Sequence, residues 1–252
     1  MTKRDEMTEK KPGSAAPLDT ISFADLQWNL PLFEDLFLSM QGQNVMLVDF
    51  YLRDLERSLI RRYIEIDRTP FPETLIVSAL SQMWIFALYE LLRTWRQRVR
   101  DLKQEAQRPP QPPAQAMPMS EITLMFRKDQ LERVRTDAAF VTGIDQAYVR
   151  IEPLFRRIEA LRMNLAKHEV PKMKGVPALA PGYGRIDLMS GSIQWQVDLG
   201  ENVVDLISRR DIADYLRAAV IGGPDPNEPR RSKKKLKERK RNAAKRTQKK
   251  RM

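Results

Sequence analysis

The only histidine of the chain, His168, lies in the segment LRMNLAKHEVPKMKG, residues 161–175. A histidine with the ordinary pKa of about 6.5 takes up and releases protons at neutral pH, so this imidazole is the candidate general acid or base. Arg162 precedes it by six positions, and on a helix the two lie about 120° apart. At a frayed or kinked helix end, both side chains could still reach one phosphate. Asn164, four residues before His168, shares its helix face.

The composition excludes several classes of enzyme. Without any cysteine the chain has no thiol nucleophile and no cysteine zinc site, and one histidine excludes a two-histidine metal site within one chain. The sequence has no GxGxxG or GxxxxGK[ST] loop to cradle phosphates and no GxSxG turn for a serine nucleophile. Carboxylate pairs are common, but none differs from an ordinary solvated helix face. We therefore expect no metal and no cofactor, with a carboxylate-only metal site as the less favoured alternative.

The segment R-MNLAK-H, residues 162–168, resembles the signature of the HEPN superfamily. That signature is an arginine, four to six residues, and then a histidine near the end of a late helix. Glu169-Val170-Pro171 leaves the helix where the pattern expects it, since the residue before a proline disfavours helical geometry. The superfamily often has a polar residue directly after the arginine, where this chain has Met163. The resemblance in helix order spans roughly residues 44–170.

The resemblance implies an α-helical bundle that acts as a metal-independent endoribonuclease, with Arg162 and His168 as its catalytic residues. In that chemistry the 2′-hydroxyl of RNA attacks the adjacent phosphorus. The histidine transfers the protons, and the arginine neutralises charge in the transition state. In the family the cleft usually lies between two protomers. The resemblance therefore implies a homodimer in which the apolar seam ending at His168 faces a partner helix.

Each of these residues also has a simpler interpretation. His168 could be a packed histidine that ends an apolar stripe, or it could contact a nucleotide or RNA without catalysis. Arg162 could form a surface ion pair with Glu159 or Glu169, an interaction that contributes little to stability. The sequence alone leaves these alternatives open.

Glu90 is the second supporting candidate beside Asn164. It lies within the apolar stretch LIVSALSQMWIFALYELLRTW, residues 75–95, where an ionised carboxylate needs a partner. In the functional interpretation, Glu90 orients Arg162 or an arginine on a neighbouring helix. In the alternative, which we favour, it pairs locally with Arg93 or Arg96.

The positive charge of the chain is concentrated at its C-terminus. Residues 230–252 contain 14 Lys and Arg and one Glu, a net charge of +13, so the other 229 residues carry −2 of the total of +11. No aromatic residue interrupts this tail, which favours non-specific phosphate contact over base stacking. The candidate nucleic-acid-binding residues are Arg230, Arg231, Lys233, Lys234, Lys235, Lys237, Arg239, Lys240 and Arg241.

The spacing of apolar residues predicts helices through the first half of the chain. Residues 20–40 have helical spacing, and Pro31 divides them into two short helices. Residues 44–66 form an amphipathic helix whose apolar face includes Val48 and whose charged outer face includes Arg53, Glu56, Arg57 and Arg61. Residues 73–106 form the longest helix, which we expect at the centre of a bundle with Met83, Trp84 and Trp95 in its core. No apolar run approaches the roughly 20 residues of a membrane helix.

Proline and glycine divide the second half of the chain. Residues 108–118, RPPQPPAQAMP, predict a semi-rigid insertion between two helices. Helix resumes over 120–138 and 139–151, and Pro153 allows a new first turn or a kink. The following seam consists of Leu154, Ile158, Leu161, Leu165 and His168.

After the loop that follows, the hydrophobic period changes from helical to alternating. Residues 186–197 alternate around Ser190-Gly191 and predict a β-hairpin, and residues 203–207 could add a third strand. Ser208 and Asp211 have the spacing of a capping box that opens a last helix.

The sum of these elements is a mainly α protein, an HEPN-like helical bundle with a small β-hairpin appendage and a disordered basic C-terminal tail. We expect a disordered segment over 1–18, a bundle over 19–170, a β-hairpin plus helix over 171–223 and the basic tail over 224–252. The absence of cysteine and of an apolar leader favours a cytoplasmic location.

Two functions from different classes follow. The first is a metal-independent endoribonuclease in a defence, toxin or RNA-processing role, with RNA as its partner, a homodimeric state, no membrane and an unidentified antitoxin or regulator. The second is a non-catalytic RNA-binding or adaptor protein that uses the bundle and the basic tail. A third, weaker interpretation is a purely structural helical protein in which His168 is buried.

Overall fold

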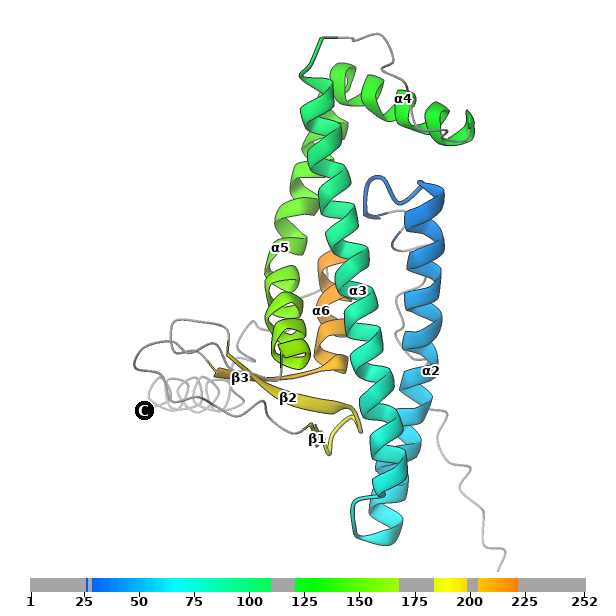
Figure 1. Ribbon diagram of the computed structural model, residues 1–252, viewed down its shortest axis with the longest axis vertical. Helices are drawn as coiled ribbons and strands as arrows, with labels where there is room; N and C mark the ends of the chain where they lie inside the picture. Colours follow the sequence, from blue (N-terminus) through cyan, green and yellow to red (C-terminus); the bar gives the residue numbers. More distant parts are fainter. Residues whose placement is uncertain (1–25, 27–28, 110–120, 168–183, 199–203, 222–252) are drawn as a thin grey trace, which may run out of the picture.

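The computed structural model describes residue 26 and residues 29–109, 121–167, 184–198 and 204–221. In that part of the chain it contains five helices and one antiparallel sheet, so the prediction of a mainly α fold with a small β element is confirmed. The long helices α2, α3 and α5 lie side by side, α6 lies beside α3 and α5, and the sheet crosses one end of α5 (Figure 1).

Helix α2 spans Leu36–Ile66 and is longer than the sequence predicts. It begins where the Asp35 carboxylate accepts hydrogen bonds from the backbone N–H groups of Phe37 (2.9 Å) and Leu38 (3.1 Å). The chain turns at Pro31, as predicted. The prediction of a separate short helix after Pro31 is wrong, because residues 36–40 are the first residues of α2. The helix ends at Asp67, which adopts the left-handed conformation (φ 48°).

Helix α3, Phe71–Ala106, is the central helix as predicted. It packs against α2, α4, α5, α6 and the sheet, and its Trp84 and Trp95 side chains are almost completely buried. Met83 is 65% exposed, so its predicted place in the core is wrong.

Helix α3 is long and apolar enough, by length and composition alone, to cross a membrane, contrary to the expectation from the sequence. This is weak evidence, because the core helix of a soluble protein passes the same test, and 44% of the apolar window is buried here.

Helices α4 (Glu121–Thr136) and α5 (Ala138–Lys167) follow, and α4 extends sideways from the end of the bundle where α3 ends and α5 begins (Figure 1). Asp137 separates them, and its carboxylate accepts hydrogen bonds from the N–H groups at the start of α5. Pro153 lies inside α5, which continues through it.

The seam of α5 is buried within its own chain. Ile158 and Leu161 are 0% exposed and Leu154 is 2% exposed. The helix packs against α3 and α6. The expectation that this seam faces a partner helix is therefore wrong, because α6 and α3 already cover it.

The sheet has the order β1-β2-β3, with strands Arg185–Ile186, Ile193–Asp198 and Val204–Ser208. Helix α6, Arg209–Ile221, follows β3 directly. The predicted capping box is present: Asp211 N–H donates to Ser208 Oγ (3.1 Å), and Ser208 N–H donates to Asp211 Oδ2 (2.8 Å). Trp195 and Ile207 of the sheet belong to the same buried cluster as the bundle, so the sheet and the helices share one hydrophobic core.

Candidate functional site

Arg162 lies near the C-terminal end of α5 and is half-buried. Its guanidinium carbon is 4.6 Å from the centre of the Tyr89 ring on α3, a cation–π arrangement. Its Nη1 atom is 3.6 Å from Met163 Sδ, a weak acceptor. Among the described residues, no carboxylate lies within ion-pairing distance of this guanidinium. The ion pair with Glu159, which the sequence left open as an alternative, is therefore not formed, and Glu159 accepts a hydrogen bond from Tyr89 instead.

Tyr89 is the platform that holds Arg162. It is buried and stacks on Phe155 of α5, with ring centres 5.3 Å apart. Burial raises the pKa of the Tyr89 hydroxyl, and the negative charge of Glu159 raises this pKa further. The phenol therefore remains protonated and donates to Glu159 Oε1 at 3.4 Å. Arg162 is therefore held on an aromatic ring, and its guanidinium pairs with no acidic side chain among the described residues.

Asn164 ties the last turns of α5 to the sheet. Its Nδ2 atom donates to the backbone carbonyl of Gln196 on β2 at 2.7 Å. The amide is therefore engaged in positioning this end of the helix.

Glu90 forms the local ion pair that the sequence favoured. Its side chain is about half exposed, and its carboxylate accepts a hydrogen bond from Arg93 Nε at 2.7 Å. Pairing with Glu90 raises the pKa of Arg93. Arg162 receives no contact from Glu90, so the structure favours the ion-pair alternative over an orienting role.

The remaining predicted site residues lie outside the described residues. His168 follows directly after the last residue of α5, Lys167, and Glu169 comes next. The predicted insertion at 108–118 is described only through residue 109, and the nucleic-acid-binding residues from Arg230 to Arg241 are also outside.

A buried ionic network joins α2 to the start of α6. Arg209 is completely buried, and its Nε and Nη2 atoms donate to the two carboxylate oxygens of Glu56 at 2.7 and 2.8 Å. Its Nη1 atom donates to Asp49. Arg53 donates to the other oxygen of Asp49 (3.0 Å), and Arg210 donates to Glu56 (3.1 Å). This geometry satisfies both buried carboxylates, which burial of charge requires.

The network determines the charge states of its members. Burial by itself would raise the pKa of Glu56, but the hydrogen bonds and charges of Arg209 and Arg210 outweigh burial and lower this pKa. Burial likewise opposes the charge of Arg209, and its carboxylate partners outweigh that effect and raise its pKa. Burial lowers the pKa of Arg53, only partly offset by Asp49. Glu56 is ionised, and both carboxylates are shielded from solvent and hydrogen-bonded to arginines, which suits a structural network and not proton transfer.

Two further contacts enclose the network. Trp84 of α3 lies against Arg209, with the guanidinium carbon 5.2 Å from its ring centre, while its indole N–H donates to the Val45 carbonyl at 2.9 Å. Gly191 in the β1–β2 turn packs on the backbone of Glu56 so closely that an added Cβ would lie 2.1 Å from the Glu56 carbonyl oxygen.

The predicted solvent exposure of Arg53 and Glu56 is therefore wrong. A spacing signal for this burial exists in the sequence: Asp49 and Glu56 are seven residues apart, and each precedes a core leucine, Leu52 or Leu59, by three positions. This periodicity places the charges on the apolar side of α2. Because Arg53 and Glu56 are charged, an exposed position on the outer face of α2 was the simpler interpretation.

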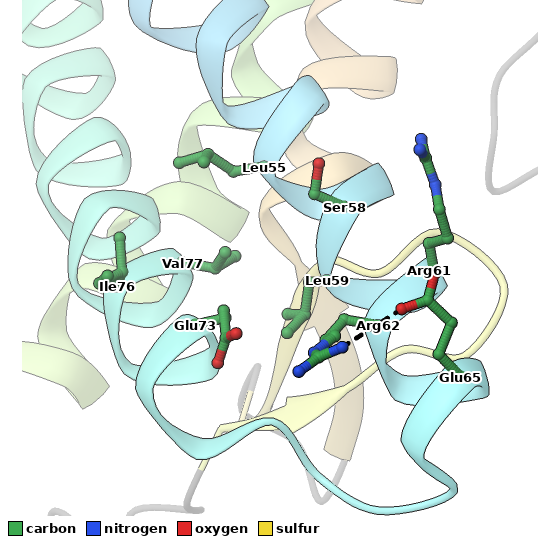
Figure 2. A pocket seen from close by; sticks show the side chains of 9 residues that line it. All are labelled: Leu55, Ser58, Leu59, Arg61, Arg62, Glu65, Glu73, Ile76 and Val77. Atoms are coloured by element: carbon green, nitrogen blue, oxygen red, sulfur yellow. Dashed lines mark hydrogen bonds and ion pairs between the residues drawn. The ribbon is translucent and has the colours of Figure 1, made fainter.

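A groove with a cavity volume of about 310 Å³ lies between the C-terminal half of α2 and the start of α3 (Figure 2). This volume is at the lower end of the range for ligand pockets. Figure 2 shows Arg61 pointing away from the apolar side chains, and Arg62 donates to Glu65 at 3.4 Å. The lining residues are Leu55, Ser58, Leu59, Arg61, Arg62, Glu65, Glu73, Ile76 and Val77. The rim charges partly neutralise one another, and the groove contains no residue of the Arg162 site.

No cluster of three or more potential metal ligands occurs within the described residues. No family model, curated protein or solved structure matches this chain.

Proposed function

We propose that this protein is a metal-independent endoribonuclease, in which Arg162 binds the scissile phosphate and His168 transfers protons during attack by the RNA 2′-hydroxyl. The observation that carries the proposal is the state of Arg162. It is half-buried, held on the Tyr89 ring, and without an acidic partner among the described residues. An arginine in a structural ion pair would already have its charge balanced, whereas this guanidinium can still bind an oxyanion.

The position of Arg162 in the fold also supports the proposal. Arg162 lies five residues before Lys167, the last residue of α5, and His168 is the next residue in the sequence. The Asn164 amide anchors this end of α5 to β2, and the Tyr89 ring restricts the arginine. A fixed arginine contributes more to binding a phosphorane-like transition state, because less motion must be frozen when the charge develops.

The chemistry needs only these two side chains and the RNA. The imidazole accepts the proton of the 2′-hydroxyl as its oxygen attacks phosphorus. The resulting imidazolium returns that proton to the 5′-oxygen as the bond between this oxygen and phosphorus breaks. The products are a 2′,3′-cyclic phosphate and a 5′-hydroxyl.

The test is cleavage of single-stranded RNA by the full chain in excess chelator. The wild type is compared with Arg162→Ala, His168→Ala and the control Arg156→Ala. Arg156 lies on the same helix, and its side chain is 76% exposed and paired with Glu152. General acid–base and electrostatic contributions of this kind are each about 100-fold or more, so both site variants should lose at least about 100-fold in rate. The control should retain the wild-type rate.

Cleavage at the wild-type rate by both site variants would eliminate this assignment, as would activity that disappears with chelator. The product ends provide a second check, because a 3′-hydroxyl end would contradict attack by the 2′-hydroxyl.

The basic tail favours a second candidate, RNA binding without cleavage. Its 14 Lys and Arg against one Glu are suited to phosphate contact through counterion release. If the tail binds RNA, the affinity for RNA should fall steeply with salt concentration in the full chain. Removal of residues 230–252 should make this salt dependence shallow. An unchanged salt dependence in the truncated chain would exclude the tail from binding.

A further inference from the structure

The outward face of the first half of α2 is apolar to a degree that the folded monomer does not explain. Six large side chains between residues 36 and 51 are 55–68% exposed: Leu36, Phe37, Met40, Leu47, Phe50 and Tyr51. They lie within an arc of about 140° on the helix, turned away from the core residues Leu38, Val45 and Leu52. A contiguous apolar patch of this kind on a soluble protein marks an interaction surface.

Helix α2 contributes no charged side chain to this face, and Arg98 of α3 lies over the Phe37 ring at one end of it (5.8 Å). The only charged residue in the segment LFLSMQGQNVMLVDFY, residues 36–51, is Asp49, which is buried in the ionic network with Arg209. Interface cores are depleted of charged residues and enriched in aromatic residues and Met, as this face is. Helices that lie on a membrane surface have Lys and Arg beside their apolar face, and residues 36–51 contain neither. The composition therefore favours a protein partner over a lipid surface.

The positions of the exposed side chains are symmetric along the helix. Leu36 and Tyr51, Phe37 and Phe50, and Met40 and Leu47 are three pairs centred on the same point, midway between residues 43 and 44. Gln43 and Asn44, at that centre, are also exposed. If two copies of α2 pack antiparallel about a two-fold axis through this point, each apolar side chain of one copy meets an apolar side chain of the other. That self-complementarity is the defining property of a two-fold interface.

The available area is also sufficient. A side chain of this size presents about 200 Å² when fully exposed, so these six residues expose roughly 700 Å² on each copy. A standard protein–protein interface buries about 800 Å² per partner.

We propose that the protein forms a homodimer through the α2 face, with two α2 helices antiparallel about an axis near Gln43 and Asn44. The inference does not depend on the proposed ribonuclease activity. Helix α2 and helix α5 pack against different sides of α3 (Figure 1). A dimer through α2 therefore leaves the Arg162 end of α5 on the outer side of each protomer, and the two sites do not share a cleft.

The first test measures the oligomeric state of the full chain by sedimentation velocity at micromolar concentrations. The wild type should sediment as a dimer. Met40→Glu and Leu47→Glu should each produce a monomer with an unchanged circular dichroism spectrum, because each change places two unpaired carboxylates in the interface. The matched control is Val149→Glu on α5, an apolar side chain that is 70% exposed, and it should remain dimeric.

The second test uses the absence of cysteine from the chain. A single Gln43→Cys variant places one thiol of each copy beside the proposed axis, and a short bis-maleimide should link the two in high yield. A Ser58→Cys variant places the thiols about 43 Å apart along the antiparallel helices, and it should give no linked dimer.

Three results would overturn the proposal: a monomeric wild type, a dimer that both glutamate variants leave intact, or equal cross-linking of the two cysteine variants. A monomer that binds anionic phospholipid vesicles and loses this binding in Leu47→Glu would identify the face as a membrane contact instead.

Discussion

Replacement of Arg209 by methionine tests whether the buried ionic network stabilises the attachment of α6 to α2. The substitution removes three hydrogen bonds, two to Glu56 and one to Asp49, and leaves both carboxylates in a buried environment. Removal of one partner from a buried ion pair costs about 3–5 kcal/mol. Arg210 still donates to Glu56 and Arg53 to Asp49, so neither carboxylate is left alone. We therefore expect a loss of about 3 kcal/mol, the lower end of that range.

The loss should depend on pH in a specific direction. In the wild type the pKa of Glu56 is lowered, so the stability that this group contributes is present above its unfolded pKa of about 4.3 and is lost as pH falls through the folded pKa. Without Arg209, burial dominates and the folded pKa of Glu56 rises above the unfolded value. The stability of the variant then increases as pH falls toward 4.3, and its deficit relative to wild type becomes smaller.

The assay is urea unfolding at pH 7 and pH 4.5, followed by circular dichroism, with a double variant that combines Arg209→Met and Glu56→Gln. The double variant should recover part of the loss, because it removes a stranded charge. The control Arg156→Met, with a 76% exposed side chain, should change the free energy of unfolding by less than about 0.5 kcal/mol. A loss below about 1 kcal/mol for Arg209→Met, or a deficit that increases toward pH 4.5, would refute this account of the network.

Two further predictions concern the attachment of the sheet. Gly191→Ala should lower the free energy of unfolding by more than about 2 kcal/mol, because φ is 73° and the new Cβ would collide with the Glu56 carbonyl. Gly143→Ala in helix α5 should instead raise the free energy of unfolding by about 0.5–1 kcal/mol, because the added Cβ would meet no atom outside its own helical turn within 4 Å. Equal effects of the two changes in thermal unfolding would contradict the close packing. Asn164→Ala should cost about 1 kcal/mol through loss of the bond to the Gln196 carbonyl, and a change near zero in urea unfolding would show that this contact does not anchor α5.

Local signals predicted the elements well where side chain and backbone act within a few residues. Asp211 opposite Ser208 and the alternating hydrophobicity of residues 186–197 each determine an element through short-range sterics or hydrogen bonding. Pro153 shows the limit of such signals. It allowed a break, but the packing of α5 on α3 and α6 is compatible with a continuous helix.

The candidate site depends on contacts that spacing does not reveal. Arg162 was selected from its spacing to His168, and the structure places it near the C-terminal end of α5, while its role in catalysis stays a prediction. Its contact with Tyr89 joins residues 73 positions apart, and the bond from Asn164 reaches Gln196 on another element. Neither contact has a local signature, because both depend on how helices and sheet pack.

The sequence by itself determined the periodicities, the charge asymmetry and the candidate chemistry of Arg162 and His168, because these follow from residue type and spacing. Only the tertiary structure decided that the side of α2 with Asp49 and Glu56 is buried. Apolar side chains on α2 remain outside, and Asp49 and Glu56 lie inside. The physical reason is that a buried carboxylate is stable only with a partner, and Arg209, 153 residues after Glu56, is brought to it by the packing of α6 and the sheet on α2 and α3.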